Sequence, residues 1–412
     1  MSLIRSLAAA YRASFAGLPR EVWVLSGALL VNRAGTMVLP FLSLYLTLDL
    51  GLTAIRAGQI IGCFGLGSMV GSYLGGWLSD RMNPLRVQHL SLFVSGIGFL
   101  VFTQLETFPA LAVGIFVVAV ITDSFRPALM VSVAHYSPPE TGKRSFALVR
   151  LAANLGMAIG PAVAGVLAHY GYVWLFVGDA ATCWAAGLVL VFTLGTGPGH
   201  DRPEESAEDS SKSSPWRDGP FLLFLLFMII LAMMFFQVWT TMPLYLRAFY
   251  SASERGIGFL LSINALLIVL TEMLLVRAVE DFNGLRTVGV GAALVGAGLF
   301  LLPFGPPFAV AVLAISVLTT GEMLALPISN TVVAGRAGRA HMGRYMGAYT
   351  LAFSTAFVIG PVAGTAVYQY VSPNALWYGI GVLGIIVGIG FASLSRPLST
   401  PRNRSGGEKE KR

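Results

Sequence analysis

The sequence predicts an all-α membrane protein with twelve transmembrane helices arranged as two six-helix pseudo-repeats. Composition, a series of long apolar stretches and an internal repeat lead to this prediction. Of the 412 residues, 55% are hydrophobic and 11% are charged, and the mean hydropathy is +0.74. Soluble domains carry about 25% charged residues, so this chain is suited to lipid. The net charge of +7 lies at helix ends and in tails, which argues against a nucleic-acid-binding domain.

Apolar stretches of about 20 residues, the length that crosses a bilayer, recur along the chain. The polar segments between and around them predict the domain organisation. Residues 1–21, with Arg5 and Arg12, predict a cytoplasmic amphipathic segment and no signal peptide. Residues 195–219, rich in Ser, Gly, Pro and acids, predict a flexible cytoplasmic linker between bundles at 22–194 and 220–394, and 395–412 predict a basic cytoplasmic tail. The predicted spans are 22–46, 57–79, 87–104, 109–135, 145–169, 172–194, 220–246, 257–278, 286–304, 307–334, 345–370 and 375–394.

Lys and Arg in short loops indicate the cytoplasmic side of a membrane protein. One side has only Arg56, Arg247 and Arg255, and the other side carries the linker, the tail and a larger basic set. We therefore expect both termini in the cytoplasm of a multi-pass protein of the bacterial inner membrane. The larger set is Arg5, Arg12, Arg20, Arg81, Arg86, Lys143, Arg144, Arg286, Arg336, Arg339 and Arg344.

The two halves repeat each other at an offset of 200 residues. Turn residues coincide with turn residues, and the offset holds without a gap across four helices. Chance similarity between apolar helices does not produce this agreement, so the chain predicts two parallel repeats. The coincident pairs include Tyr45 with Tyr245, Asn83 with Asn283, Arg86 with Arg286, Arg144 with Arg344, and Ile159-Gly160-Pro161 with Ile359-Gly360-Pro361.

The loop between the second and third spans, GGWLSDRMNPLR, carries charges close to two apolar helices. It resembles the loop between helices 2 and 3 of the major facilitator superfamily, G-x-L-x-D-R-x-G-R/K-x. Asn83 replaces the usual glycine, and we expect it to tolerate the left-handed backbone of that position. The resemblance implies that Asp80 and Arg81 latch the two halves together while the cavity faces outward. The matching residues are Gly76, Leu78, Asp80, Arg81 and Arg86.

Ionisable residues within the spans are candidates for the transport site, because each costs about 2.5–3.5 kcal/mol at the bilayer centre. Arg33, Asp123, Arg126 and Glu322 lie near mid-span in helices 1, 4 and 10, and Glu272 lies nearer the cytoplasmic end of helix 8. The family resemblance implies that helices 1, 4, 7 and 10 line a central cavity. A carboxylate there would carry a proton, and the arginines would keep it ionised or bind an anionic group. The alternative is a permanent Asp123–Arg126 ion pair.

Uncharged polar residues near mid-span extend this candidate site. Asn32 and Gln237, in helices 1 and 7, are predicted to contact the cargo or, alternatively, only to hold helices together. Asp179 and Arg150 lie within a few turns of helix ends, where we expect them to snorkel or to bind the ends of neighbouring helices.

The fifth span carries small residues at intervals of four or five, which allow close helix packing. They are Gly156, Gly160, Pro161 and Gly165. The stretch resembles the G-x-x-x-G-P-x-x-G-G signature of facilitator-superfamily antiporters, with Ala164 in place of one glycine. In contrast, Ile115 occupies the position of an arginine that drug antiporters usually carry.

No enzyme signature, P-loop or His/Cys metal cluster is present in the sequence. We therefore expect a non-enzymatic, cofactor-free transporter that acts as a monomer and draws on a proton gradient. The resemblance favours a proton-coupled antiporter that exports a small amphipathic organic compound by alternating access. The alternative is a proton-coupled symporter that imports peptides or organic anions, suggested by a loose likeness of Asn32-Arg33 and Tyr45-Leu46-Thr47 to oligopeptide transporters. A membrane sensor accounts less well for the buried charges.

Overall fold

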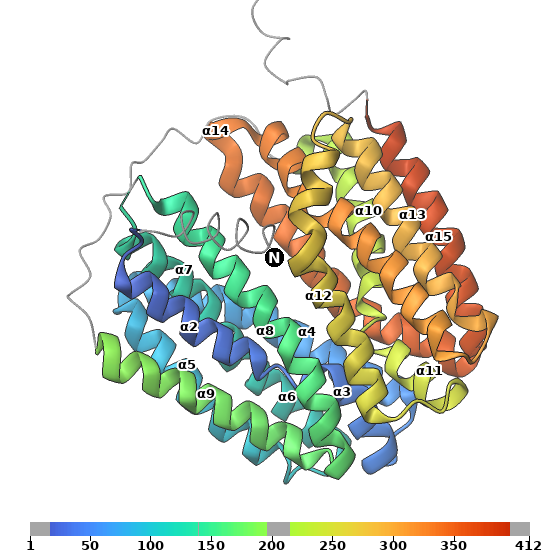
Figure 1. Ribbon diagram of the computed structural model, residues 1–412, viewed down its shortest axis with the longest axis horizontal. Helices are drawn as coiled ribbons and strands as arrows, with labels where there is room; N and C mark the ends of the chain where they lie inside the picture. The colour runs from blue at the N-terminus through green and yellow to red at the C-terminus, as the bar shows by residue number, and fades with distance from the viewer. Residues whose placement is uncertain (1–16, 139, 196–214, 396–412) are drawn as a thin grey trace, which may run out of the picture. The chain divides into compact units, whose positions relative to one another are not determined.

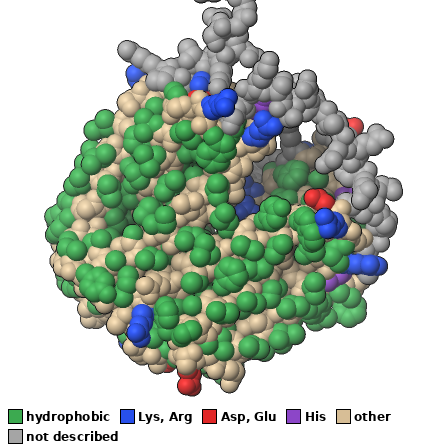
Figure 2. Space-filling view, turned by 180° about the vertical axis from the view of Figure 1, so that it is seen from behind, with side chains coloured by type: hydrophobic (Ala, Val, Ile, Leu, Met, Phe, Trp, Pro, Cys, Tyr) green, Lys and Arg blue, Asp and Glu red, His purple; other side chains and the backbone are tan. Residues whose placement is uncertain are grey.

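The computed structural model of the protein describes residues 17–138, 140–195 and 215–395. The predicted all-α class is confirmed, because these residues form helices and no strand. Twelve helical stretches within the described chain are long and apolar enough to cross a membrane. Each of them overlaps one predicted span. Hydrophobic side chains are spread over the face shown in Figure 2 and charged side chains are few on it, as expected for a surface in lipid.

Contacts divide the chain into two compact units. Unit 1 comprises Met1–Pro203 and Ala252–Val269, and unit 2 comprises Glu204–Ser251 and Leu270–Arg412. This division differs from the predicted bundles at helix α12 (Glu254–Ala278), whose first half clusters with unit 1. The reason is close packing, since Gly258 of α12 lies directly against the backbone of Pro161 and Gly165.

Unit 1 contains the first six spans (Figure 1). Its core is built from fully buried apolar side chains such as Leu25, Leu92, Phe125 and Leu190. Its elements are α2 (Arg20–Ala34), α3 (Val38–Leu44), a π-helix η1 (Tyr45–Asp49), α4 (Ala54–Arg81), α5 (Pro84–Phe102), α6 (Phe108–Asp123), α7 (Phe125–Tyr136), α8 (Gly142–Tyr170) and α9 (Val173–Leu194).

Unit 2 contains one long element, α14, which carries two spans, Phe308–Ala337 and Met342–Tyr370. The chain turns back within it, because the Ser329 and Tyr349 hydroxyls are 2.7 Å apart, whereas twenty residues of straight helix would cover about 30 Å. The elements of this unit are η2 (Pro215–Arg217), α10 (Gly219–Phe236), α11 (Thr241–Phe249), α13 (Gly284–Phe300), η3 (Leu302–Phe304), α14 (Phe308–Tyr370) and α15 (Pro373–Ser393), with the second half of α12.

The first, fourth and seventh spans are interrupted near mid-length. The first break covers residues 35–37, between α2 and α3, and the second break covers residues 237–240, between α10 and α11. The fourth span changes from α6 to α7 at Ser124. Irregular backbone at membrane depth is tolerated only where it is buried in protein or lines a water-filled cavity. Each interruption adjoins a polar residue that the sequence marked as a candidate for the site.

The expected left-handed backbone at Asn83 is wrong. Its φ of −54° is ordinary, and its side chain caps α5 by accepting a hydrogen bond from the Leu85 N–H at 2.8 Å. Proline is favoured at the first position of a helix because it has no N–H that needs a partner there. The residue before it, Asn83, is then the N-cap, and its side chain accepts from the N–H that follows the proline. Asn283, its counterpart in the repeat, caps α13 by accepting from the Arg286 N–H at 3.1 Å. The repeat is therefore visible in the caps of both units.

The predicted linker ends earlier than expected. Residues 196–214, like residues 1–16 of the predicted amphipathic segment, lie outside the described residues. Residues 215–217, in contrast, form a short 3-10 helix, and Asp218 is buried. Asp218 caps α10 and ends the polar segment because its carboxylate has strong partners in unit 2.

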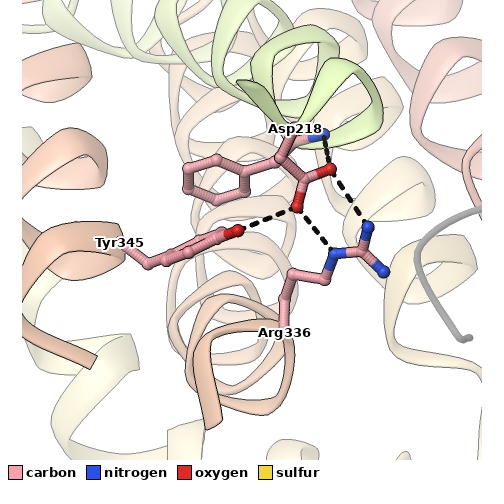
Figure 3. A network of polar contacts seen from close by, with 4 residues as sticks. Asp218, Arg336 and Tyr345 are labelled. Atoms are coloured by element: carbon pink, nitrogen blue, oxygen red, sulfur yellow. Dashed lines mark hydrogen bonds and ion pairs between the residues drawn. The ribbon is translucent and has the colours of Figure 1, made fainter. Parts of the chain in front are cut away.

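These partners form the network drawn in Figure 3. Arg336 donates to both carboxylate oxygens of Asp218, at 2.9 and 3.0 Å, and the Tyr345 hydroxyl donates to one of them at 3.0 Å. The Asp218 side chain is 2% exposed and that of Arg336 10% exposed. The network therefore joins the start of α10 to both spans of α14. Positions 18 and 136, the repeat counterparts of 218 and 336, hold Leu18 and Tyr136 in a hydrophobic cluster.

Candidate functional site

Three of the predicted site residues come together in unit 1. Arg33 lies in the last turn of α2, Asp123 is the last residue of α6, and Arg126 lies in the first turn of α7. Arg33 interacts electrostatically with both partners, attractively with Asp123 and repulsively with Arg126. Arg33 and Asp123 are partly buried, and Arg126 is exposed. These residues of helices 1 and 4 are part of the charge cluster that the sequence predicted, and the other predicted mid-span member, Glu322 of helix 10, belongs to unit 2.

The permanent Asp123–Arg126 pair, the alternative left open by the sequence, is not formed. Both residues are described, and no N–O distance of 4.0 Å or less joins them. The helix changes from α6 to α7 between them, so they do not share one regular helical surface. The Ile121 carbonyl, close to this change, accepts hydrogen bonds from the Ser91 hydroxyl at 2.6 Å and the Ser124 hydroxyl at 2.7 Å. Helix α5 thereby helps to hold the interrupted fourth span.

Glycines of the fifth span set the position of Arg33 from one side. A Cβ atom on Gly156 would lie 2.6 Å from the Arg33 Cβ atom and 2.9 Å from the Ala34 nitrogen. A Cβ atom on Gly160 would lie 3.2 Å from the carbonyl oxygens of Arg33 and Ala34. The first half of the antiporter-like motif is therefore in contact with the backbone that carries Arg33.

The other half of the motif contacts α12. A Cβ atom on Gly165 would lie 2.6 Å from the Glu254 carbonyl oxygen and 3.1 Å from the Gly258 Cα atom. The Tyr172 hydroxyl donates to the Glu254 carboxylate at 3.4 Å, near the same end of α8. The small residues of the fifth span thus serve two close helix contacts, as their spacing predicted.

The two predicted amides are engaged in hydrogen bonds. Asn32 donates to the Cys183 sulfur of α9 at 3.5 Å and stays partly exposed. Gln237 is 3% exposed and lies in the second break. Its amide nitrogen donates to the Met233 and Gly360 carbonyls, each at 2.9 Å. Its oxygen accepts from two threonine hydroxyls, Thr240 at 3.2 Å and Thr241 at 2.9 Å.

A glutamine side chain offers two N–H donors and two acceptor sites. Met233, Gly360 and Thr241 occupy both donors and one acceptor site, and the single Thr240 proton is shared between the Gln237 oxygen and the Phe236 carbonyl, 3.1 Å away. The geometry supports the helix-holding alternative for Gln237, while Asn32 keeps hydrogen-bonding capacity next to Arg33. Gln237 is thus an anchor between α10 and the second span of α14.

The predicted glutamates of unit 2 lie at one level. The Thr271 hydroxyl of α12 donates to the Met323 sulfur of α14 at 3.4 Å, and Glu272 and Glu322 each adjoin one member of this contact. Glu272 is 9% exposed and Glu322 is partly buried. From its position in the sequence, Glu272 is expected nearer the cytoplasm than Glu322. The contact between α12 and α14 shows that the two glutamates lie at a similar height along their helices.

Within the described residues no group of three or more His, Cys, Asp or Glu side chains is placed to hold a metal ion.

The stretch GGWLSDRMNPLR begins within α4, and its first glycine takes part in a close helix contact that the sequence did not predict. A Cβ atom on Gly76, the predicted motif glycine, would have no atom within 4 Å, whereas a Cβ atom on Gly75 would lie 2.6 Å from the Ser124 Cα atom. Gly67 and Gly71 face the backbone of α6 in the same way, beside Phe116 and Val120. The spacing of four between these glycines was the available signal.

The charged residues of this loop are accessible. Asp80, Arg81 and Arg86 are exposed, and the Arg81 guanidinium lies 3.9 Å from the centre of the Trp77 ring. The cation–π contact holds Arg81 against its own helix. The latch role of Asp80 and Arg81 stays a prediction.

We expect Asp80→Asn to reduce the transport rate without lowering thermal stability. An exposed carboxylate contributes little to the folded state, but a latch that favours one transport state acts on states only a few kcal/mol apart. Transport in reconstituted vesicles and the melting temperature in detergent are the measurements. Asp281→Asn, an exposed carboxylate in the corresponding loop of unit 2, is the control. Wild-type transport by a well-expressed Asp80→Asn protein would rule the latch out.

Comparisons with known proteins agree with this architecture. The chain is 24% identical over 405 residues to a Na(+), Li(+), K(+)/H(+) antiporter of Planococcus maritimus, covering 90% of this chain and 92% of that protein. It is 28% identical over 134 residues to a multi-drug resistance efflux pump PmrA homolog of Lactococcus lactis, covering 32% and 33% of the two chains. A crystal structure of a POT family transporter in complex with 5-aminolevulinic acid superposes with a TM-score of 0.80 at 14% identity, over 94% of this chain and 98% of that one.

The structural likeness, at this low identity, shows the fold alone. The sequence profile of the Major Facilitator Superfamily matches residues 24–253 and 225–412. Together these matches cover both predicted repeats and all twelve candidate spans. The chain belongs to the Major Facilitator Superfamily and is a transporter, not an enzyme.

Proposed function

We propose that the protein is a proton-coupled antiporter that exports a small amphipathic organic compound from a bacterial cytoplasm. The observation that carries the proposal is the cluster of Arg33, Asp123 and Arg126 beside interrupted helices. The Asp123 carboxylate interacts with Arg33 over a distance, and within the described chain it makes no salt bridge with Arg126. Such a group can exchange a proton with water when its surroundings change.

The mechanism follows from this electrostatic balance. With Asp123 ionised, the attraction to Arg33 offsets the repulsion between the two arginines. When Asp123 binds a proton, Arg33 and Arg126 lose that counter-charge and repel a cationic cargo such as ethidium, which the ionised carboxylate attracts. Proton and cargo then exclude each other from the cluster, which is the requirement for antiport. Energy comes from the proton gradient, so the proposal includes no bound cofactor.

Two further observations support antiport. The antiporter-like glycines of α8 pack against Arg33 itself, so the motif and the charge cluster form one assembly. The named relatives include an antiporter for inorganic cations and a multidrug efflux pump. We place both termini on the cytoplasmic side of the inner membrane, from the distribution of Lys and Arg, and take the monomer as the working unit. Peptide symport remains the alternative.

The proposal predicts the behaviour of two neutral variants, Asp123→Asn and Glu322→Gln. Both keep the shape and much of the hydrogen bonding of the native side chain but cannot titrate. Both should lose gradient-driven transport, while cargo binding or exchange survives in at least one of them. The measurement uses purified protein in liposomes with an imposed pH gradient and ethidium as the probe.

The same liposomes separate the alternatives. Ethidium movement against the proton flux supports organic antiport, proton release on addition of Na⁺ or K⁺ supports cation antiport, and dipeptide uptake with the protons supports symport. If both variants still concentrate the transported probe, the two carboxylates are structural and Glu272 becomes the next candidate.

A further inference from the structure

Helix α9 holds the first break through the side chain of Asp179. Its Oδ1 accepts from the Met37 N–H at 2.9 Å, and its Oδ2 accepts from the Val38 N–H at 3.3 Å. The Asp179 side chain is 3% exposed. Both bonds go to the start of α3, where the backbone N–H groups have no partners within the helix. Of the two roles expected for Asp179, snorkelling and binding a neighbouring helix end, the structure shows the second.

A second contact from the same helix reaches the other side of the break. Cys183 lies one turn after Asp179 and accepts from the Asn32 amide at 3.5 Å. Asn32 immediately precedes Arg33 in the sequence, so this contact reaches the end of α2 that carries the site. Between these two contacts, Thr182 lies directly against Gly35, where a Cβ atom would collide with its side chain. Helix α9 therefore contacts the residues just before and just after Arg33 and its break.

We propose that Asp179 is a positioning residue for Arg33: by holding the first break against α9, it keeps the Arg33 guanidinium beside Asp123 and Arg126. The glycines of α8 support the same backbone from another side. The inference rests on the proposed function in one respect only, namely that Arg33 acts in transport.

The form of the contact explains why an aspartate is required. An ionised carboxylate has two acceptor oxygens, and here each one accepts from a different backbone N–H. An asparagine of the same shape has one oxygen, and its NH₂ group would face the second N–H. The Met37 N–H also lies 2.7 Å from the Gly35 carbonyl oxygen. The hydrogen bond that Asp179→Asn removes is therefore mainly the one from the Val38 N–H. Asp179→Asn should loosen the start of α3 without adding volume.

The first test measures the break directly, by the reactivity of Cys183. Cys63 is the other of the two cysteines of the chain, so all three proteins compared carry Cys63→Ala. We expect Asp179→Asn to make Cys183 react with N-ethylmaleimide about tenfold faster, because losing one buried hydrogen bond shifts a local opening by about this factor. Thr193→Val, at an exposed position of the same helix, is the control and should not change the rate. Equal labelling rates for all three proteins would overturn the proposal.

The second test asks whether Asp179 acts through Arg33. In ethidium/proton exchange, Asp179→Asn should lower the rate in the wild-type background and have little further effect in an Arg33→Gln background. A purely structural role would lower the rate by the same factor in both backgrounds, and this result would contradict positioning. Asp179→Glu, which keeps both acceptor oxygens, should retain more activity than Asp179→Asn.

A measurement on unmodified protein covers the case in which Asp179→Asn fails to fold. The Val38 amide should exchange hydrogen more slowly than the Ala110 amide, which lies in the first turn of α6 where the N-cap Thr107 makes no side-chain bond. Faster exchange at Val38 would overturn the proposal. Faster labelling of Cys183 in a protein that moves none of the probes would instead refute the proposed antiport and leave the hold on the break intact.

Discussion

Replacing Arg336 with glutamine is expected to lower the free energy of unfolding by about 3–5 kcal/mol, the usual cost of breaking a buried ion pair from one side. The substitution removes the guanidinium that donates to both oxygens of the Asp218 carboxylate, which is 2% exposed. Tyr345 and the Phe221 N–H continue to donate to it, but neither carries a charge. The melting temperature of the purified protein in detergent measures the loss.

Arg286→Gln is the matched control, because Arg286 is an exposed arginine of the same unit. It should change the melting temperature little, since exposed charges contribute little to stability. An equal melting temperature for Arg336→Gln and Arg286→Gln would show that the buried network does not stabilise unit 2.

The effect of Arg336→Gln should depend on pH. Burial raises the pKa of Asp218, but the hydrogen bonds from Arg336 and Tyr345, the Arg336 charge and the Phe221 N–H together lower it further than burial raises it. A carboxyl with a lowered folded-state pKa stabilises the protein fully above its ordinary value of about 3.9 and loses this contribution as pH falls through the folded-state pKa. The difference between wild type and Arg336→Gln should be complete at pH 7 and shrink below about pH 4. A difference that grows on acidification would contradict this assignment.

Gly156→Leu is expected to abolish most transport and to destabilise the protein by about 1–3 kcal/mol or more, as overpacking does. Even a Cβ atom at this position would lie 2.8 Å from the Leu30 carbonyl oxygen and 2.6 Å from the Arg33 Cβ atom. Helices α2 and α8 must therefore move apart, and Arg33 moves with α2. Initial rates of ethidium/proton exchange and melting temperatures are the measurements.

Two related variants give a graded comparison for Gly156→Leu. Gly160→Leu should be milder, because its nearest backbone oxygens lie 3.2 Å from the added Cβ atom. Gly27→Leu, on α2 itself, meets nothing within 4 Å and should be neutral, since leucine favours the helix more than glycine does. If all three variants behave alike, close contact between α2 and α8 does not control the site.

The sequence could predict the spans, their number and the gathering of Arg33, Asp123 and Arg126. The length of an apolar stretch is a local property of the sequence, so it predicts the spans. A charged side chain at mid-span must face the protein interior or a partner, so residue types also predict that such charges gather. The backbone at Asn83 was predicted wrongly because the family glycine suggested a left-handed turn. The following Pro84 was the better guide, since it marks the first residue of a helix and makes Asn83 a cap.

Other features depend on partners that residue types do not reveal. Asp218 stood in a polar segment that resembles a linker, and its partner Arg336 lies 118 residues further along the chain. Asp179 is bound by backbone N–H groups, which every residue except proline possesses, so the sequence showed only that it lay near a helix end. Gln237 was placed at mid-span correctly, but only the positions of Met233, Gly360, Thr240 and Thr241 show that its amide is engaged by protein partners.

The two breaks also differ in the ionisable character of the side chain that lies at each of them. The first helix of each repeat is interrupted at nearly the same register, but a carboxylate, Asp179, holds the first break and a carboxamide, Gln237, occupies the second. A carboxylate changes its charge when it takes up a proton, whereas a carboxamide stays neutral across the pH range in which proteins are folded. The two repeats thus share a break in the backbone but hold it with side chains of different chemistry, and of the two only the carboxyl side chain can carry a charge.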